Sequence, residues 1–183
     1  RELEEVKKEI DRLIREVEEV NKDVVRKIKE TIRRSREINK RVVDEIRRLI
    51  KELDDVVKTK GGESEEVVRI ADEILERIKK LIEEVKEVTR RIHETNKRLL
   101  EEVKELTDEV LKTIRELVED ARRRGVDERE LRKVLEKVER VVKKSRDHLD
   151  RVYEDSERVV RESEKHLDEV LERVREEIER IRK

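Results

Sequence analysis

Hydrophobic residues recur along most of the chain with the period of an α-helix. Val, Ile and Leu stand among charged residues at spacings of three and four, and apolar positions also recur in a longer repeat, as at Val6, Val24 and Val42. Eighteen residues, the length of this repeat, make five turns at 3.6 residues per turn, the period of a straight helix without supercoiling. The pattern therefore predicts long, straight amphipathic helices, each with one inward-facing stripe about 140° wide.

Two short segments interrupt this pattern. Gly61 and Gly62 can end one helix, and Ser64 can cap the next. Further on, Gly125 can take the left-handed conformation that ends a helix, and Asp127 can cap the helix that follows. Both segments are therefore predicted to be loops.

These loops divide the chain into three helices, expected at about residues 2–59, 64–123 and 127–182. Connections this short place consecutive helices antiparallel. The expected fold class is all-α: a long, straight, untwisted, up-down-up three-helix bundle. Residues 1–183 are expected to form a single domain, with each helix roughly 85 Å long.

Polar residues without a formal charge interrupt the inward stripes at regular positions. We interpret them as a structural polar network inside the bundle. They are Asn21, Thr31, Ser35, Asn39, Thr89, His93, Asn96, Thr107, Ser145, His148, Tyr153, Ser156, Ser163 and His166.

Antiparallel pairing groups these residues at three levels. One group recurs one repeat later, with its second-helix member shifted in the opposite sense: Asn21, Thr107, Ser145 and His148 recur as Asn39, Thr89, Ser163 and His166. The third layer, between them, contains Thr31, Ser35, His93, Asn96, Tyr153 and Ser156. We expect buried hydrogen-bond networks that specify helix register, because a slip would leave buried polar groups unpaired.

Composition narrows the range of functions. Charged residues make up 56% of the chain, and 51 basic and 52 acidic residues are interspersed to a net charge of −1. This distribution shows no basic patch of the kind that nucleic acid or an anionic membrane requires. Cysteine is absent, no apolar run is long enough to span a bilayer, and no targeting signal is recognised. We expect a soluble protein without a nucleic-acid, membrane or small-molecule partner; its localisation is unknown beyond the cytoplasm of an expression host.

Histidine and serine raise two chemical alternatives. His148 and His166 lie roughly 27 Å apart on one helix, and His93 maps to another height, so the three imidazoles cannot share the metal ion that needs three or four convergent ligands. Ser145 with His148, or Ser156 with His93, has the residue types of a nucleophile and base. No inward carboxylate, oxyanion hole or cleft accompanies them. We expect no metal site, no cofactor, no catalytic residue and no enzyme activity.

Taken together, the chain resembles parametrically generated de novo helical bundles that carry buried hydrogen-bond networks. The resemblance covers the whole chain and depends on the exact repeat, the Val/Ile/Leu stripes, the Glu/Lys/Arg surface and the loop Gly125-Val126-Asp127. It implies a designed, hyperstable scaffold without an evolved activity.

Three functional hypotheses remain at this point. The first is a monomeric structural scaffold that requires no partner. The second is an interaction module that contributes three helices to a larger designed homo- or hetero-oligomer, since an inward arc of about 140° also suits a four-helix bundle. The third is a pH-responsive scaffold, because burial of His93, His148 and His166 would lower the pKa of each imidazole below its usual value.

Overall fold

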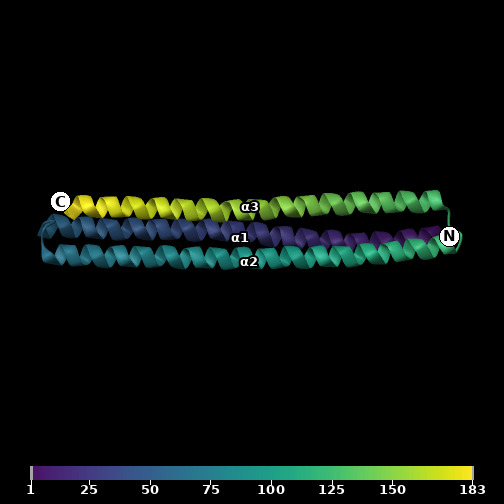
Figure 1. Ribbon diagram of the computed structural model, residues 1–183, viewed down its shortest axis with the longest axis horizontal. Coiled ribbons are helices and arrows are strands. Elements are labelled where there is room, and N and C mark those ends of the chain that lie inside the picture. The colour runs from purple at the N-terminus through teal and green to yellow at the C-terminus, as the bar shows by residue number, and fades with distance from the viewer. Residues whose placement is uncertain (1, 183) are drawn as a thin grey trace. The chain divides into compact units, whose positions relative to one another are not determined.

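The computed structural model describes residues 2–182 and contains three helices, with no strand in that range: α1 (Glu2–Lys60), α2 (Glu65–Arg123) and α3 (Glu128–Arg182) (Figure 1). The all-α prediction is confirmed, and the predicted helix ends differ from the observed ones by no more than a residue. The stripe period and the loop residues were therefore sufficient to place the elements.

The first loop ends α1 with a single backbone hydrogen bond. Gly61 has φ +87°, a left-handed conformation that favours glycine, and its amide donates to the carbonyl of Val57 at 2.8 Å. This is the αL type of C-terminal cap. Gly62 lies close to the end of α3, where a Cβ atom built on it would stand 2.5 Å from the carbonyl oxygen of Ile181. Both glycines are therefore required by local geometry.

The second loop ends α2 with a Schellman cap. Gly125 has φ +86°; its amide donates to Arg122 O and the amide of Val126 donates to Ala121 O, each at 3.1 Å. Asp127 then caps α3, because its Oδ1 accepts from the amide of Arg129 at 3.0 Å. The caps predicted at Gly125 and Asp127 are confirmed.

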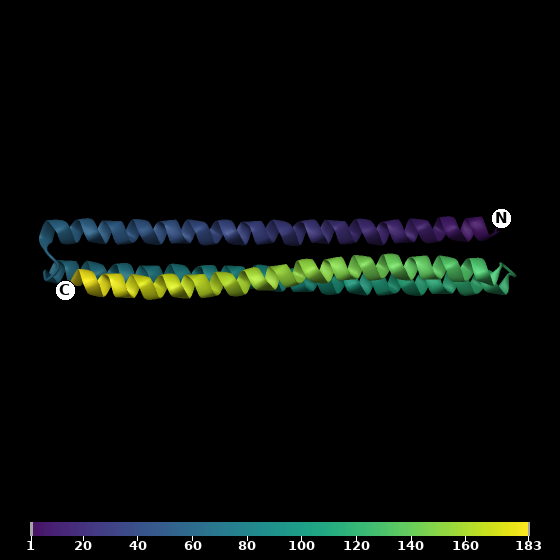
Figure 2. The same cartoon turned by 90° about the horizontal axis from the view of Figure 1, so that it is seen from above.

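Contacts divide the chain into two compact units. Unit 1 contains the described residues up to Glu30 together with Glu94–Asp155; unit 2 contains Thr31–His93 together with the described residues from Ser156 onward. Within each unit, segments of all three helices run side by side (Figures 1 and 2). Each unit is described separately below.

Each unit has its own hydrophobic core, to which all three helices contribute. In unit 1 the buried cluster consists of Ile10, Ile14, Ile114, Val118, Ala121, Leu131, Val138 and Val142. In unit 2 it consists of Ile46, Leu49, Leu53, Ala71, Ile74, Ile78, Ile82, Val85, Leu167, Val174 and Ile178. Fully burying a Val, Leu or Ile side chain contributes roughly 1.5–3 kcal/mol, so the aliphatic stripes supply the main favourable term.

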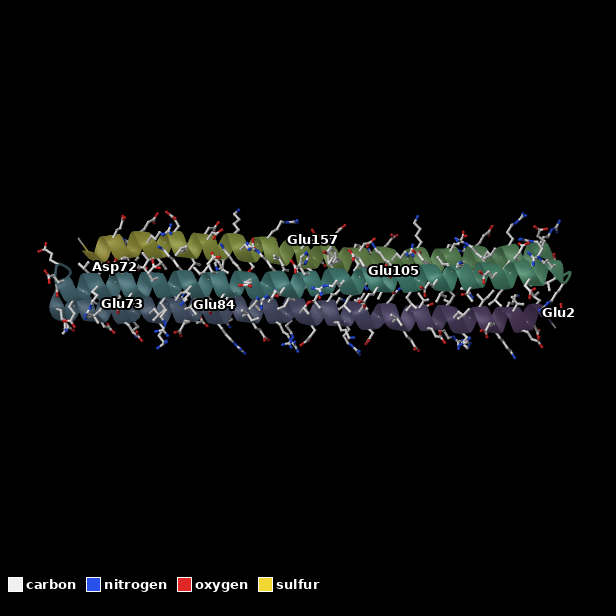
Figure 3. All side chains as sticks on the ribbon, turned by 60° about the horizontal axis from the view of Figure 1, so that its bottom comes forward. Glu2, Asp72, Glu73, Glu84, Glu105 and Glu157 are labelled. Atoms are coloured by element: carbon white, nitrogen blue, oxygen red, sulfur yellow. The ribbon has the colours of Figure 1, made fainter. Side chains whose placement is uncertain are left out.

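Charged side chains cover the outer faces of the helices, as the labelled carboxylates Glu84 and Glu105 illustrate (Figure 3). Arg12 pairs with Glu9 and Glu16 on α1, one helical turn to either side. The same triad recurs two repeats later as Glu45, Arg48 and Glu52. Exposed pairs of this kind contribute little to stability, so the surface provides solvation more than folding energy.

Candidate functional site

Two asparagine–serine pairs join α1 to α3. In unit 1, Asn21 Nδ2 donates a hydrogen bond to Ser145 Oγ, and in unit 2, Asn39 Nδ2 donates to Ser163 Oγ. The partners are separated by 124 residues in both cases. The sequence repeat is therefore reproduced as a repeated contact, at the same helix register in each unit.

Both asparagine–serine pairs are at least partly buried. Asn21 is 4% exposed and Ser163 is 7% exposed, while Asn39 and Ser145 are half-buried. Each amide uses its NH₂ group in the pair, but Asn21 Oδ1 and Asn39 Oδ1 are buried and accept no hydrogen bond within the described residues. An unsatisfied buried acceptor costs about 1–3 kcal/mol, so each pair uses the amide nitrogen as a donor and leaves the amide oxygen unsatisfied.

The two threonines predicted beside these pairs bond elsewhere. Thr89 and Thr107 are 1% and 2% exposed, and their hydroxyls donate to Val85 O and Val103 O of α2, each at 2.8 Å. A helical threonine can satisfy its hydroxyl in this way through the carbonyl four residues earlier. The structure thus brings together the asparagine and serine of each predicted group, while these threonine hydroxyls bond within their own helix.

The prediction that His148 and His166 are buried is wrong, since both are exposed. The reason lies in helix geometry. Leu149 and Leu167 point inward at 1% and 0% exposure, and the residue before each leucine is rotated about 100° away from it. The two histidines therefore lie at the solvent edge of the stripe, without the burial that the third hypothesis required of them.

The central polar layer is divided between the two units. In unit 2, His93 Nδ1 and Ser156 Oγ are 3.3 Å apart; Ser156 is 4% exposed and His93 is half-buried. Unit 2 also contains the half-buried Thr31 and the 3%-exposed Ser35. In unit 1, Asn96 is 1% exposed and Tyr153 is half-buried.

Ion pairs between α2 and α3, which the sequence reasoning missed, repeat with the same period. Lys86 pairs with Asp168 in unit 2. Moving one repeat forward on α2 and one repeat back on α3 gives the unit 1 pair Lys104–Asp150, at 2.8 Å. Antiparallel register applied to the charged flanks of the stripe would have found both pairs.

A second set of α2–α3 pairs repeats with its signs exchanged. Arg90 pairs with Glu164 at 2.8 Å in unit 2, and its counterpart in unit 1 is Asp108 with Arg146. The hydrogen bond to Glu164, and then the charge of that carboxylate, raise the pKa of Arg90. These ion pairs link α2 to α3 in each unit.

The arrangement offers little for catalysis or metal binding. In unit 2 the hydroxyl of Ser156 lies next to the imidazole of His93, but Ser156 is buried, so a substrate could not reach its hydroxyl. Within the part of the chain that the structure describes, no three His, Asp or Glu side chains converge as metal ligands. No helix in residues 2–182 has the length and apolarity to cross a membrane.

A comparison with solved structures identifies the fold. A protein described as "Computationally designed three helix bundle" matches 98% of this chain and 88% of its own, with a TM-score of 0.63 and 18% sequence identity. This chain is a three-helix bundle. No protein-family model matches it, and no curated protein sequence matches it. At this identity the similarity concerns the bundle fold alone.

Proposed function

We propose that this three-helix bundle is a designed structural scaffold, folding as one domain, whose polar pairs specify the register between α1 and α3. The observation that carries the proposal is the shared separation of 124 residues in Asn21–Ser145 and Asn39–Ser163. The all-helical fold, the regular stripe and the similarity to a designed bundle support the scaffold role.

The pairs can specify register because aliphatic packing alone discriminates poorly between neighbouring registers. Val, Ile and Leu recur along every stripe, so a slip of one turn would still bury apolar surface. Such a slip would remove the Asn21 amide from Ser145 and leave a buried donor unpaired, at a cost of about 1–3 kcal/mol. A slip of one full repeat would match Asn21 to Ser163, but the two short loops exclude it.

The proposal is tested by measuring register with and without the pairs. Spin labels replace Arg15 of α1 and Glu139 of α3, two exposed residues of unit 1 with the same sequence separation as the pairs. The parent background should give one narrow distance distribution. The variant with Asn21→Leu, Ser145→Ala, Asn39→Leu and Ser163→Ala should give a broader or multiple distribution.

A variant with Thr89→Val and Thr107→Val is the matched control, because it also removes buried hydroxyls but leaves the α1–α3 pairs intact. Its distance distribution should match that of the parent. An unchanged, narrow distribution in the variant that lacks the four pair residues would contradict a role in register.

A further inference from the structure

The loop between α1 and α2 is exposed and weakly held. Lys58, Lys60 and Gly61 are all exposed. Gly61 N donates to Val57 O at 2.8 Å, whereas the turn bond from Ser64 N to Gly61 O is long, at 3.4 Å. Local interactions at the end of α1 therefore hold this loop in place.

Buried anchors lie far from this loop on both sides. Leu53 of α1 and Val67 of α2 are each 0% exposed, and none of the thirteen residues between them is buried. Residues 54–66 can therefore change conformation while both anchors stay buried. The basic residues of this segment are Lys58 and Lys60.

The loop between α2 and α3 is more basic but more tightly anchored. It contains three consecutive exposed arginines, at positions 122–124. Ala121 is 2% exposed and Leu131 is 0% exposed, and only nine residues separate these two anchors. The Schellman cap and the Asp127 cap hold the backbone between them.

This difference matters for cleavage by proteases. A protease binds its substrate chain in an extended conformation, over several residues on both sides of the cleaved bond. Exposed loops that can open in this way are the preferred sites of cleavage. An extended residue spans about 3.3–3.6 Å and a helical one about 1.5 Å, so unwinding the last turn of α1 gives the first loop the necessary slack.

The two loops differ in what must move with them. Gly62 approaches the carbonyl oxygen of Ile181, but Ile181 lies near the end of α3 (Figure 1), and helix ends fray. The first loop can therefore open at the expense of contacts at helix ends. The second loop reaches the same length only by withdrawing Ala121 or Leu131 from the core of unit 1.

We propose that the peptide bond between Lys60 and Gly61 is a cleavage site for proteases that cut after Lys or Arg. The protease adds water across this bond, which leaves a carboxylate on Lys60 and a free amine on Gly61. Entry of Lys60 into the specificity pocket breaks its ion pair with Glu66, and exposed pairs of this kind are weak. This modification site goes beyond the scaffold role.

Lys60 is better placed for cleavage than Lys58. Lys58 pairs with Asp54 at 3.1 Å, and the hydroxyl of Thr59 donates to Asp55 O at 3.0 Å. Cleavage after Lys58 therefore requires further unwinding of α1.

The cut separates α1 from the α2–α3 hairpin but removes no residue from either core. α1 contributes Ile10 to the buried cluster of unit 1 and Leu53 to that of unit 2. The stabilisation from such burial depends on apolar area and not on chain continuity. The cleaved protein is therefore expected to persist as a non-covalent complex of residues 1–60 and 61–183.

Limited proteolysis of the full chain tests the site. Trypsin is the probe, under native conditions, and intact-mass spectrometry identifies the fragments in timed samples. Cleavage after Lys60 should be at least about tenfold faster than cleavage in residues 122–129, because the rate follows the population of the locally opened form. The cleaved protein should elute from size-exclusion chromatography as one species that contains both fragments.

Matched variants assign the cut to the first loop. Lys58→Gln with Lys60→Gln should slow the separation of α1 from the hairpin at least tenfold. A variant with Gln at all three arginine positions 122–124 should keep the rate of the parent within twofold. Circular dichroism checks that both variants are as helical as the parent.

Two peptides distinguish the effect of the fold from that of the local sequence. Peptides of residues 54–66 and 122–130 contain the same basic residues without the helices that anchor them. The arginine-rich peptide should be cut at least as fast as the other. The preference of the folded chain for the first loop should therefore be absent from the peptides.

Three results would overturn the proposal. The first is cleavage after Lys60 that is no faster than cleavage after Lys58, in the second loop or in a helix interior. The second is a tenfold preference for residues 54–66 in the peptides themselves, which would assign the selectivity to local sequence. The third is elution of two separate fragments in native buffer, which would show that the cores do not hold α1 after the cut.

Discussion

Replacing Asn21 by Leu should stabilise the isolated chain. Asn21 is 4% exposed, makes one side-chain hydrogen bond and leaves its Oδ1 unsatisfied. The substitution loses the hydrogen bond, about 1 kcal/mol, and removes the unsatisfied acceptor, which contributes about 1–3 kcal/mol in the opposite direction. Leu also adds apolar burial of roughly 2 kcal/mol. Ser145 is half-buried, so water can replace its lost partner.

The net expectation is a gain of about 2–4 kcal/mol in the free energy of unfolding. Guanidinium denaturation followed by circular dichroism measures it, and a gain of about 2 kcal/mol moves the midpoint up by about 0.5 M. Thr89→Val serves as the matched control. It removes a buried hydroxyl that is satisfied within α2, so its effect should stay within about 1 kcal/mol.

A fall in the midpoint for Asn21→Leu, with the slope of the transition unchanged, would refute this reasoning. It would mean that the amide makes more favourable interactions in the folded chain than its single bond to Ser145. The sign is informative because the scaffold proposal assigns the pairs to register and not to stability. Replacing both partners of a buried hydrogen bond by apolar groups of the same shape can be nearly neutral or stabilising.

Three further predictions follow from the loops, the surface and the core. Gly62→Ala should lower stability more than Gly125→Ala. The Cβ at position 62 would meet the backbone oxygen of Ile181 at 2.5 Å, whereas the Cβ at position 125 meets no atom and costs only the left-handed strain of φ +86°, about 1–2 kcal/mol. Guanidinium midpoints compare the two, and equal losses would contradict the close approach. The pKa values of Glu9, Glu45 and Glu66 are lowered by hydrogen bonds to Arg12, Arg48 and Lys60 respectively, so their stabilisation is present above the unfolded pKa of about 4.3 and is lost as pH falls through the folded pKa. The midpoint should hold between pH 7.5 and 5.5 and decline below about pH 4; a midpoint that stays constant down to pH 3 would contradict the contribution of these carboxylates. Calorimetry should show no complete melt below about 90 °C, as for idealised bundles, and two separate transitions would contradict folding as one domain.

The helices and loops were predictable because local chemistry determines them. Gly125 adopts a left-handed conformation that few other residues take, and Asp127 belongs to the few residue types that cap a helix well. The repeating stripe leaves little ambiguity about which face of each helix points inward. The asparagine–serine pairs were also within reach, because the repeat placed Asn21 and Ser145 in one predicted group. These features need no knowledge of tertiary packing beyond antiparallel order.

Side-chain partners at the edge of the stripe were less predictable. Loop midpoints placed Asn21 level with His148, whereas it contacts Ser145, about one turn earlier on α3. An error of one turn is small for a helix but decides which side chain lies opposite. The threonine hydroxyls had a second acceptor in their own helix, and a periodic pattern does not show which one is used.

The most direct test of the register proposal is NMR of the asparagine side-chain amides. The Asn21 and Asn39 NH₂ groups should give nuclear Overhauser effects to the β protons of Ser145 and Ser163, and the Asn21 group, the more buried of the two, should exchange slowly with solvent. The same contacts should appear in both units, since both pairs have the same separation of 124 residues. Rapidly exchanging amides without contacts to α3 would contradict the proposal that these pairs specify register.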